Sequence, residues 1–386
     1  MRIIYITNTR LPTEKARGVQ IMKSCEAFVQ AGVSVELVAP LQKNPIKGDP
    51  FSYYGVERVF NIKKVYSGDF LSRMVSKISD RTAFYLRSSV FALFSTACFL
   101  LSKHKKPDHF FYSRDYAVLF LLGLFNFNFL AEIHDLRPSR TRILLKYVFK
   151  KAKKIIVNSE GTRDEVLKFG TPHSKILVAH NGVDIEFFNI KESKEEARKK
   201  LSIPSDKKII AYVGRLESIG LEKGVGDLIE AFKMVHSEIS DMMLYIVGGP
   251  SSYIEKYNKF AEDYSNIVFT GQVDYQIIPS YLRAFDVVVI PSPAKQQFLT
   301  ASPIKLFEFL AAGKTVITSD LPSLRRVLNE KNSLFFKPEN VDDLAQKIKF
   351  VFENPDIADK LAKEAFNDSQ KYSWVSRAKL ILDFIR

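Results

Sequence analysis

The sequence predicts an α/β protein with two domains, each built on a parallel sheet. Short apolar runs, typical of strands buried on both faces, alternate with helical patterns along the whole chain. The alternation stops at a charged stretch, residues 189–204, and then restarts. A chain of 386 residues is long enough for two separate cores. We therefore place a domain boundary between residues 190 and 205.

The first half contains seven expected strands. After the first strand, a loop is followed by a helix whose apolar face lies within residues 21–29 and which ends near Gly32. The loop holds Gly18, where the backbone can approach a ligand, but no dinucleotide-binding GxGxxG pattern is present. The expected strands are residues 2–6, 34–39, 56–65, 108–113, 127–133, 154–158 and 175–179.

Residues 69–104 read as one basic, amphipathic helical segment. Its polar side carries Arg73, Lys77, Arg81 and Arg87, and its other side is apolar. The pattern is typical of a helix that packs on a core, and also of a helix that rests on a membrane interface. We favour core packing for most of the segment.

His134 and Asp135 follow the strand 127–133 at its expected carboxyl end. A lone histidine is more often a structural residue, but open α/β sheets bind ligands at this edge, so the position shifts the interpretation toward a functional histidine. Arg137, Arg140 and Arg142 lie just beyond, and either face an anionic acceptor or form a solvated helix face.

The second half repeats the rhythm of strands and helices. A strand over 208–213 leads into Gly214-Arg215-Leu216, and a loop then reaches Lys223 and a helix from Val225. Further expected strands are residues 242–247, 267–270, 286–290, 315–318 and 333–336. The final expected helix runs from Trp374 to Arg386.

The stretch Thr300 to Lys314 organises this half. A polar loop precedes a helix that carries Ser302 and Pro303 at its start, suitable for an N-cap and a first turn, and Gly313 ends the helix. A helix N-terminus at the carboxyl edge of a parallel sheet is an anion site. Glu308, two turns in, is placed to accept hydrogen bonds from sugar or ribose hydroxyls. The alternative is an ordinary βαβ unit with Glu308 solvated.

Charge is distributed unevenly between the halves. Residues 1–190 hold 29 Lys and Arg against 16 Asp and Glu, whereas the rest of the chain is nearly neutral. A basic half suggests an anionic partner such as phospholipid head groups, a phosphorylated acceptor or nucleic acid, although it can also serve solubility alone. Two cysteines, no signal peptide pattern and apolar stretches too short for a span predict a cytoplasmic protein.

Taken together, the motifs resemble those of the retaining GT-B-fold glycosyltransferases of family 4. These motifs are HNGVD at 180–184, GRL…EKG at 214–224, IVGGP at 246–250, TGQV at 270–273 and SPIKLFEFLAAGK at 302–314. The resemblance implies two Rossmann-like domains facing across a cleft, with a C-terminal helix that crosses back to the first. The acceptor-binding domain would comprise residues 1–190 and 372–386, and the nucleotide-sugar-binding domain residues 191–371.

The resemblance also assigns roles. Arg215 and Lys223 match the cations that stabilise the departing nucleotide diphosphate without a metal, Glu308 matches the ribose-binding carboxylate, and His134 matches a histidine near the donor sugar. The other donor-binding positions are Gly18, Gln272, Val273, Thr300, Ala301, Ser302, Pro303 and Ile304. Acceptor-side positions are Arg114, Asp135, Arg137 and Asn181.

Thr300 is a departure from the family. Many relatives carry two glutamates in an E-x7-E pattern, and Thr300 stands at the first of these positions. A hydroxyl therefore replaces the carboxylate expected near the donor sugar. No protein nucleophile is evident, which agrees with the family's front-face retention, in which the departing phosphate oxygen helps to deprotonate the acceptor.

The expected function is transfer of a sugar from a UDP- or GDP-sugar to a glycan or lipid-linked acceptor, in surface polysaccharide or glycoconjugate synthesis. No cofactor or metal is expected, and the basic half would contact the inner face of the cell membrane. Two alternatives are a nucleotide-sugar epimerase-like enzyme of the same architecture and a non-enzymatic nucleic-acid-binding protein. The absence of clustered aromatic and basic motifs on a nucleic-acid-binding fold argues against the last.

Overall fold

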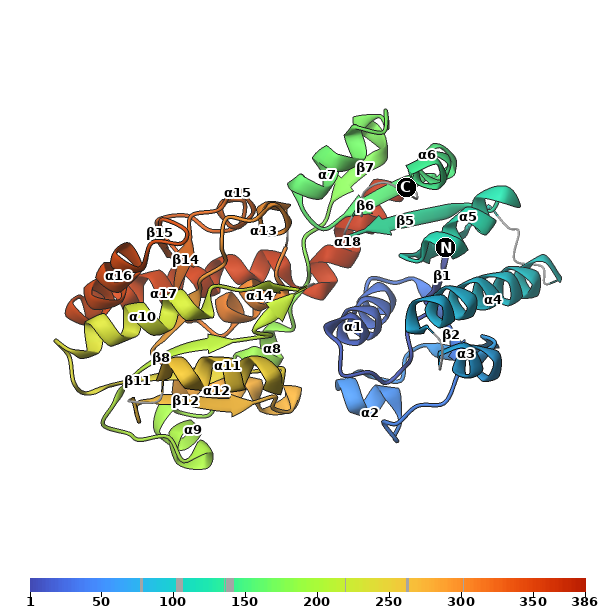
Figure 1. Cartoon of the computed structure of the whole chain (residues 1–386). Coiled ribbons are helices and arrows are strands. Elements are labelled where there is room, and N and C mark those ends of the chain that lie inside the picture. Colours follow the sequence, from blue (N-terminus) through green and yellow to red (C-terminus); the bar gives the residue numbers. More distant parts are fainter. Residues whose placement is uncertain are drawn as a thin grey trace. The chain divides into compact units, whose positions relative to one another are not determined.

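The computed structural model describes residues 1–76, 79–101, 107–134, 136, 142–218, 220–261, 264–300 and 302–386. The chain forms two compact units (Figure 1). The first comprises residues 1–182 and 374–386, and the second comprises residues 183–373. The sequence placed residues 183–190 in the first domain. They belong to the second unit because Val183 and Phe188 are buried in its core.

The first unit contains a seven-stranded parallel sheet in the order β3-β2-β1-β4-β5-β6-β7. The strands are β1 (Arg2–Ile6), β2 (Ser34–Leu41), β3 (Asn61–Tyr66), β4 (His109–Ser113), β5 (Phe129–Ile133), β6 (Lys154–Val157) and β7 (Ile176–Val178). Ile4 is in register with Glu36 on one side and Phe111 on the other. All seven expected strands are present, although β3 begins five residues later than the sequence indicated.

Helices cover both faces of this sheet, and alternate strand residues point into the two layers. On one face lie α1 (Ala16–Gln30), α2 (Pro50–Tyr54) and α18 (Trp374–Ile385). On the other face lie α4 (Asp80–Leu101), α5 (Tyr116–Leu124), α6 (Arg142–Lys151) and α7 (Glu160–Leu167). Two further elements are α3 (Asp69–Ser76), which packs on α4, and the 3-10 helix η1 (His173–Lys175). The last helix therefore packs in the first unit, as expected.

The expected single helix over residues 69–104 is two helices, α3 and α4. With 22 residues, α4 is the described helix that is long and apolar enough to cross a membrane by length and composition alone. The expectation that the apolar stretches are too short for a span is therefore wrong for α4 by length and composition. Phe91 and Phe99 of α4 are buried in the core of the unit, so part of the helix is committed to packing on the sheet.

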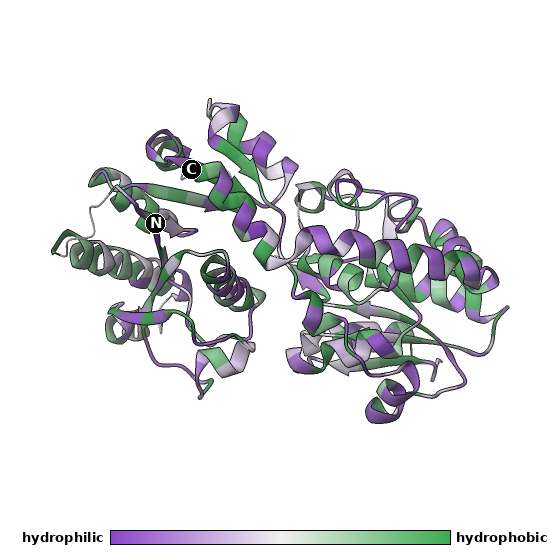
Figure 2. Ribbon diagram, turned by 180° about the vertical axis from the view of Figure 1, so that it is seen from behind, coloured by the Kyte–Doolittle hydropathy of each residue, from purple (hydrophilic) through white to green (hydrophobic). Residues whose placement is uncertain are grey.

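The second unit contains a six-stranded parallel sheet in the order β12-β11-β8-β13-β14-β15. The strands are β8 (Lys208–Val213), β11 (Met242–Val247), β12 (Ile267–Gly271), β13 (Val287–Ile290), β14 (Thr315–Ser319) and β15 (Leu334–Phe336). A separate antiparallel pair, β9 (Glu217–Ser218) and β10 (Leu221–Glu222), lies where the sequence indicated only a loop. In Figure 2 the strands of both sheets are largely green, as expected for strands with buried faces.

Two helical layers sandwich the second sheet. One layer contains α10 (Val225–His236), α11 (Ser251–Ala261) and α16 (Val341–Glu353). The other contains α8 (Ile185–Phe188), α9 (Lys194–Leu201), α12 (Ile278–Ala284), α14 (Ile304–Ala311), α15 (Pro322–Arg325) and α17 (Pro355–Ser369). The remaining elements are α13 (Gln296–Thr300), which occupies the expected loop before α14, and the 3-10 helices η2 (Tyr275–Ile277) and η3 (Gln370–Tyr372).

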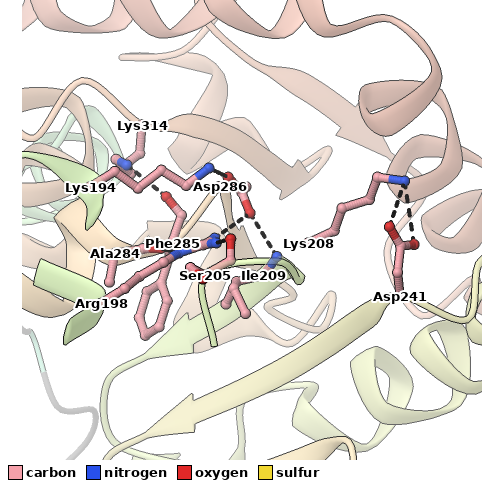
Figure 3. Close-up of polar contacts among 10 residues, drawn as sticks. All are labelled: Lys194, Arg198, Ser205, Lys208, Ile209, Asp241, Ala284, Phe285, Asp286 and Lys314. Atoms are coloured by element: carbon pink, nitrogen blue, oxygen red, sulfur yellow. Dashed lines mark hydrogen bonds and ion pairs between the residues drawn. The ribbon is translucent and has the colours of Figure 1, made fainter. Parts of the chain in front are cut away.

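A fully paired charge cluster lies at the amino ends of β8 and β13 (Figure 3). Asp286, just before β13, accepts hydrogen bonds from the Ile209 N–H at 2.7 Å and from Arg198 at 2.9 Å, and it also pairs with Lys194. Lys314 donates to the Phe285 carbonyl oxygen at 2.7 Å. These charges tie strand starts to helices, on the edge of the sheet opposite the expected ligand site.

Candidate active site

The strand order of the second unit changes direction at β8. β8 pairs with β11 on one side and with β13 on the other, and the helices that follow β8 and β13 cover opposite faces. Ligands of open parallel sheets bind beside such a point, outside the carboxyl ends of the strands. The loop that follows β8 and the loop that follows β13 touch here. A Cβ atom at Gly224, in the first loop, would lie 1.8 Å from the Pro291 carbonyl oxygen in the second. With a φ of +76°, position 224 requires glycine on conformational grounds as well.

Three cations influence one another at these loops. Arg215 follows β8, Lys223 precedes α10, and Lys305 lies in the first turn of α14. Burial, with the positive charges of Arg215 and Lys305, lowers the pKa of the Lys223 ammonium to about 8, although Glu217 opposes the shift. Among the described residues, no carboxylate lies within ion-pair distance of the Lys223 ammonium. The site therefore favours an anion.

The N-terminus of α14 differs in detail from the expectation. Pro303, and not Ser302, occupies the N-cap position, and no side chain caps the helix. Pro303 has no N–H group, so it cannot bind an anion through its backbone, whereas the first N–H groups of α14 have no partner within the helix. Ala301 lies outside the described residues. The expected helix end at Gly313 is confirmed, with a φ of +58°.

Glu308 is buried beside these cations, with only 2% of its surface exposed. Its Oε1 atom accepts a hydrogen bond of 3.2 Å from the Tyr275 hydroxyl. Its Oε2 atom lies 2.7 Å from the Lys305 ammonium. Tyr275 is itself stacked on Phe187, with ring centroids 5.3 Å apart. The carboxylate is therefore held in place by its own unit, and the solvated-face interpretation of Glu308 is wrong.

Gln272 and Val273 follow directly after β12 at the same edge of the sheet. Gln272 is exposed, and a Cβ atom at Gly249, in the loop after β11, would lie 3.9 Å from the Gln272 Cβ atom. Val273 packs against the core of the unit. Thr300 is the last residue of α13. The loops after β8, β11, β12 and β13 thus bring most of the expected donor-binding residues to one edge.

The first unit has its own change of direction at β1, which pairs with β2 and β4. Asp115, after β4, accepts hydrogen bonds from the Asn8 N–H at 2.8 Å and from Arg17 at 2.6 Å. The neighbouring Arg114 donates to Gln20 Oε1 at 2.8 Å. The Gln20 amide donates in turn to Asn181 Oδ1 at 2.8 Å, so two expected acceptor-side residues, Arg114 and Asn181, are joined through a third.

Glu132 and Arg377 form a buried ion pair beside His134. The Arg377 Nη2 atom lies 2.7 Å from Glu132 Oε1, and both side chains are 4% exposed. Arg377 Nε also donates to the His180 carbonyl oxygen at 2.9 Å. His134 Nε2 lies 2.5 Å from the same Glu132 oxygen. A residue of the last helix therefore fixes a carboxylate in β5, and that carboxylate contacts the candidate histidine.

His134 is neutral in this setting. Burial and the positive charge of Arg114 lower its pKa to about 4, although the Glu132 carboxylate acts in the opposite direction. The pKa of the Glu132 carboxyl lies well below its usual range, because Arg377 and His134 outweigh the effect of burial. An ionised carboxylate only accepts hydrogen bonds, so Nε2 carries the proton of His134 and Nδ1 is left as an acceptor.

The remaining expected residues divide into two groups. Asp135, Arg137 and Arg140 lie outside the described residues. Gly18 lies within α1 and not in a loop, and its N–H donates to the Lys15 carbonyl oxygen at 2.9 Å. A Cβ atom at Gly18 would lie 2.0 Å from the Tyr54 hydroxyl, so the glycine makes room for a tyrosine that bonds to the backbone of Thr13. The expectation that Gly18 lies in a loop is wrong, and its donor-binding role stays a prediction.

Two family models match the chain, one in each half. Glycosyltransferase Family 4 matches residues 18–187, and Glycosyl transferases group 1 matches residues 193–368. The chain belongs to these glycosyltransferases. The expected family is therefore confirmed.

Named relatives agree with this assignment. The glycosyltransferase is 29% identical over 232 residues to an uncharacterized glycosyltransferase of Methanocaldococcus jannaschii, a match that covers 58% of this chain and 57% of the relative. It is 25% identical over 421 residues to the D-inositol 3-phosphate glycosyltransferase of Corynebacterium urealyticum, covering 100% of this chain and 95% of the relative. The chain thus spans little more than half the length of the first relative and nearly all of the second.

A solved structure confirms the GT-B fold. The Anabaena protein HepE, solved in complex with UDP, has a TM-score of 0.71 to the glycosyltransferase at 14% identity. The match covers 99% of both chains. At this identity the similarity concerns the fold.

Sequence reasoning missed two residues at the candidate site of each unit of the glycosyltransferase: Glu132 and Arg377 in the first unit, and Tyr275 and Lys305 in the second. Glu132 gave one signal, since a charged residue in the apolar run 129–133 needs a buried partner. Arg377 gave none, because its partner is 245 residues away in the sequence. Among the described residues, no group of three or more His, Cys, Asp or Glu side chains is arranged to hold a metal. Metal independence stays an expectation.

Proposed function

We propose that this glycosyltransferase moves a sugar from a UDP- or GDP-sugar to a glycan or lipid-linked acceptor, with retention of anomeric configuration and without a metal. We place this activity in the cytoplasm, in the synthesis of surface polysaccharides or glycoconjugates. The observation that carries the proposal is the Lys223 ammonium, half-buried beside two other cations and without a carboxylate partner among the described residues.

The second unit would bind the nucleotide. Arg215 and Lys223 would neutralise the diphosphate, assisted by the first N–H groups of α14. Glu308, oriented by Tyr275, would accept hydrogen bonds from the ribose hydroxyls. Gln272 and Val273 would border the base. The HepE structure with UDP supports a nucleotide ligand for this fold.

Bond cleavage would place negative charge on the diphosphate. As the bond between the sugar's anomeric carbon and the phosphate oxygen breaks, its electron pair stays on that oxygen, and nearby cations stabilise the charge. The acceptor hydroxyl would attack from the same face and pass its proton to the departing phosphate oxygen. His134 would orient a sugar hydroxyl through Nδ1, which is an acceptor when Nε2 carries the proton. No side chain of the protein would act as a nucleophile.

The acceptor is proposed on chemical grounds. The first unit carries most of the positive charge of the chain, and Arg114 lies at the carboxyl edge of its sheet. The name of the Corynebacterium relative, a D-inositol 3-phosphate glycosyltransferase, supports an acceptor that bears phosphate. Thr300, in place of a carboxylate, would read the donor sugar through a hydroxyl.

Thermal unfolding with UDP and with GDP, each in magnesium and in EDTA, tests the donor site. A nucleotide at one hundred times its dissociation constant should stabilise the fold by about 2.7 kcal/mol. We expect a shift with one nucleotide, independent of magnesium and lost in Lys223→Ala. Lys360→Ala, which changes an exposed lysine of α17, is the matched control and should keep the shift. No shift with either nucleotide would refute the donor site.

A further inference from the structure

The outer surface of helices α3, α4, α5 and α6 combines apolar side chains with positive charge. We call these four helices the outer layer. α4, α5 and α6 cover one face of the first sheet side by side, and α3 packs on α4. Large apolar side chains of the layer that are more than one-third exposed are Phe70, Met74, Phe84, Tyr85, Leu93, Phe94, Leu100, Leu101, Leu124 and Ile143.

α4 is apolar on two opposite sides. Its inner side buries Phe91 and Phe99, and Phe99 packs edge-on against Phe111 of β4 with ring centroids 5.0 Å apart. Its outer side carries Tyr85, Leu93 and Leu101, which are 56%, 57% and 90% exposed. In Figure 2 the second half of α4 is mostly green, whereas α16 and α17 alternate between green and purple. A helix of a soluble domain normally places polar residues on its outer side.

The exposed apolar surface extends beyond α4. Tyr66, at the end of the edge strand β3, packs against Phe94 with ring centroids 5.0 Å apart. Ile143, at the start of α6, is 89% exposed. By contrast, among the described residues the second unit exposes four large apolar side chains, each on a different helix: Met234, Phe260, Phe350 and Ile357. Contiguous exposed apolar surface of this kind marks an interaction site.

Charge identifies the partner. α5 and α6 contain no acidic residue, and α3 and α4 contain one each, Asp69 and Asp80, in their first turns. The basic residues of the layer include Arg81, whose guanidinium lies 5.9 Å from the Tyr85 ring centroid, and the exposed Lys146 and Lys150 of α6. Cations beside exposed aliphatic and aromatic side chains suit an anionic bilayer, where head groups meet the cations and acyl chains meet the apolar groups.

We propose that the outer layer is a docking surface for an anionic phospholipid bilayer, on which it lies without crossing it. Crossing would require α4 to leave the sheet and expose Phe91 and Phe99, which are 0% and 1% exposed. Nucleic acid fits less well, because Leu93, Leu101 and Ile143 offer nothing to phosphates or base edges. The proposal is independent of the donor site, which lies in the other unit.

Flotation with lipid vesicles tests the surface. The probe vesicles contain phosphatidylcholine with about one-third phosphatidylglycerol, and the comparison vesicles contain phosphatidylcholine alone. We expect binding to the anionic vesicles, weaker binding to the neutral ones, and loss of binding at high salt. Equal binding to both vesicles, or to neither, would overturn the proposal.

Two variants locate the surface. The triple variant Leu93→Ser, Leu101→Ser, Ile143→Ser changes exposed side chains only, and should raise the vesicle concentration for half-binding at least about tenfold. A charge variant, Lys146→Glu with Lys150→Glu, should weaken binding to the anionic vesicles alone. The matched control is Met234→Ser, Phe260→Ser, Ile357→Ser in the second unit, which should bind as the unmodified chain does.

Two further measurements on the same variants test whether lost vesicle binding comes from damage to the donor unit or from dissociation of a dimer. The thermal shift with nucleotide, measured on each variant, should be unchanged, which shows that the donor unit is intact whatever the vesicles show. Light scattering without lipid should give the same mass for the triple variant and the unmodified chain. A dimer that the triple variant dissociates would assign the outer layer to a second copy of the chain and overturn the proposal, as would unaltered vesicle binding by the triple variant.

Discussion

Arg377→Met should be among the most destabilising single substitutions in the first unit. Arg377 and Glu132 are each 4% exposed and lie 2.7 Å apart, so removing the guanidinium leaves a buried carboxylate without its charge partner. Breaking a buried pair from one side typically costs about 3–5 kcal/mol of unfolding free energy. The lost hydrogen bond to the His180 carbonyl oxygen adds to this cost.

The assay uses the only tryptophan of the chain. Trp374 is 8% exposed at the start of α18, in the same helix as Arg377, so its fluorescence reports unfolding of the first unit in urea. The matched control is Lys168→Met, which breaks a pair with Glu165 whose side chains are 65% and 36% exposed. Exposed pairs contribute about 0–1 kcal/mol, so the control should be nearly neutral.

The double variant Arg377→Met with Glu132→Gln shows whether the loss of stability comes from the unpaired carboxylate or from lost packing of the arginine side chain. If the uncompensated charge causes the loss, replacing the carboxylate by an amide should restore most of the stability. A single variant that costs less than about 1 kcal/mol would refute the reasoning. So would a double variant no more stable than Arg377→Met, since the loss would then come from packing of the arginine side chain.

Three further predictions concern the candidate site. Because the pKa of Lys223 is about 8, the affinity for UDP in titration calorimetry should fall by up to about tenfold between pH 7 and 9, with most of the fall above pH 8, and should lose this dependence in Lys223→Arg. Tyr275→Phe should weaken UDP binding roughly threefold to tenfold by freeing the Glu308 carboxylate, and an unchanged affinity would contradict the ribose assignment. Since the folded pKa of His134 is about 4 and the unfolded value about 6.5, unfolded chains take up the proton first. The urea stability of the first unit should therefore fall by roughly 2 kcal/mol from this group between pH 7 and 4.5, and His134→Gln should remove that part.

The sequence predicts those strands and helices whose residue pattern is visible within a single segment of the chain. Buried parallel strands are continuous apolar runs, so the sequence predicts all seven strands of the first sheet and all six of the second. The helix that carries Glu308 was also expected, with its end at Gly313, because an apolar helical face and a glycine with positive φ are both visible in sequence. What sequence could not show was the side chain that faces each polar group.

Gly18 illustrates the limit. A glycine after a strand suggests an open backbone, but the space above Gly18 is filled by Tyr54, which arrives from another helix. Glu308 illustrates the same limit from the other side. Its burial depends on Tyr275, which follows a different strand, so sequence left the solvated face open as an alternative. The space above Gly18 and the burial of Glu308 both depend on which loops and helices lie next to one another in the fold, and the sequence does not show this.

A depressed lysine pKa does not by itself identify a functional site in this protein. Burial lowers the pKa of Lys314 to about 7, further than that of Lys223, yet Lys314 donates to the Phe285 carbonyl oxygen and lies near Asp286 at the amino ends of the strands (Figure 3). Lys223 lies at the carboxyl ends, where its described neighbours include two cations and where four loops meet. A lysine whose hydrogen bonds are made by its own fold is part of the scaffold. One that is held among like charges gains stability only when an anion arrives, and this difference is the reason that we propose the donor diphosphate at Lys223.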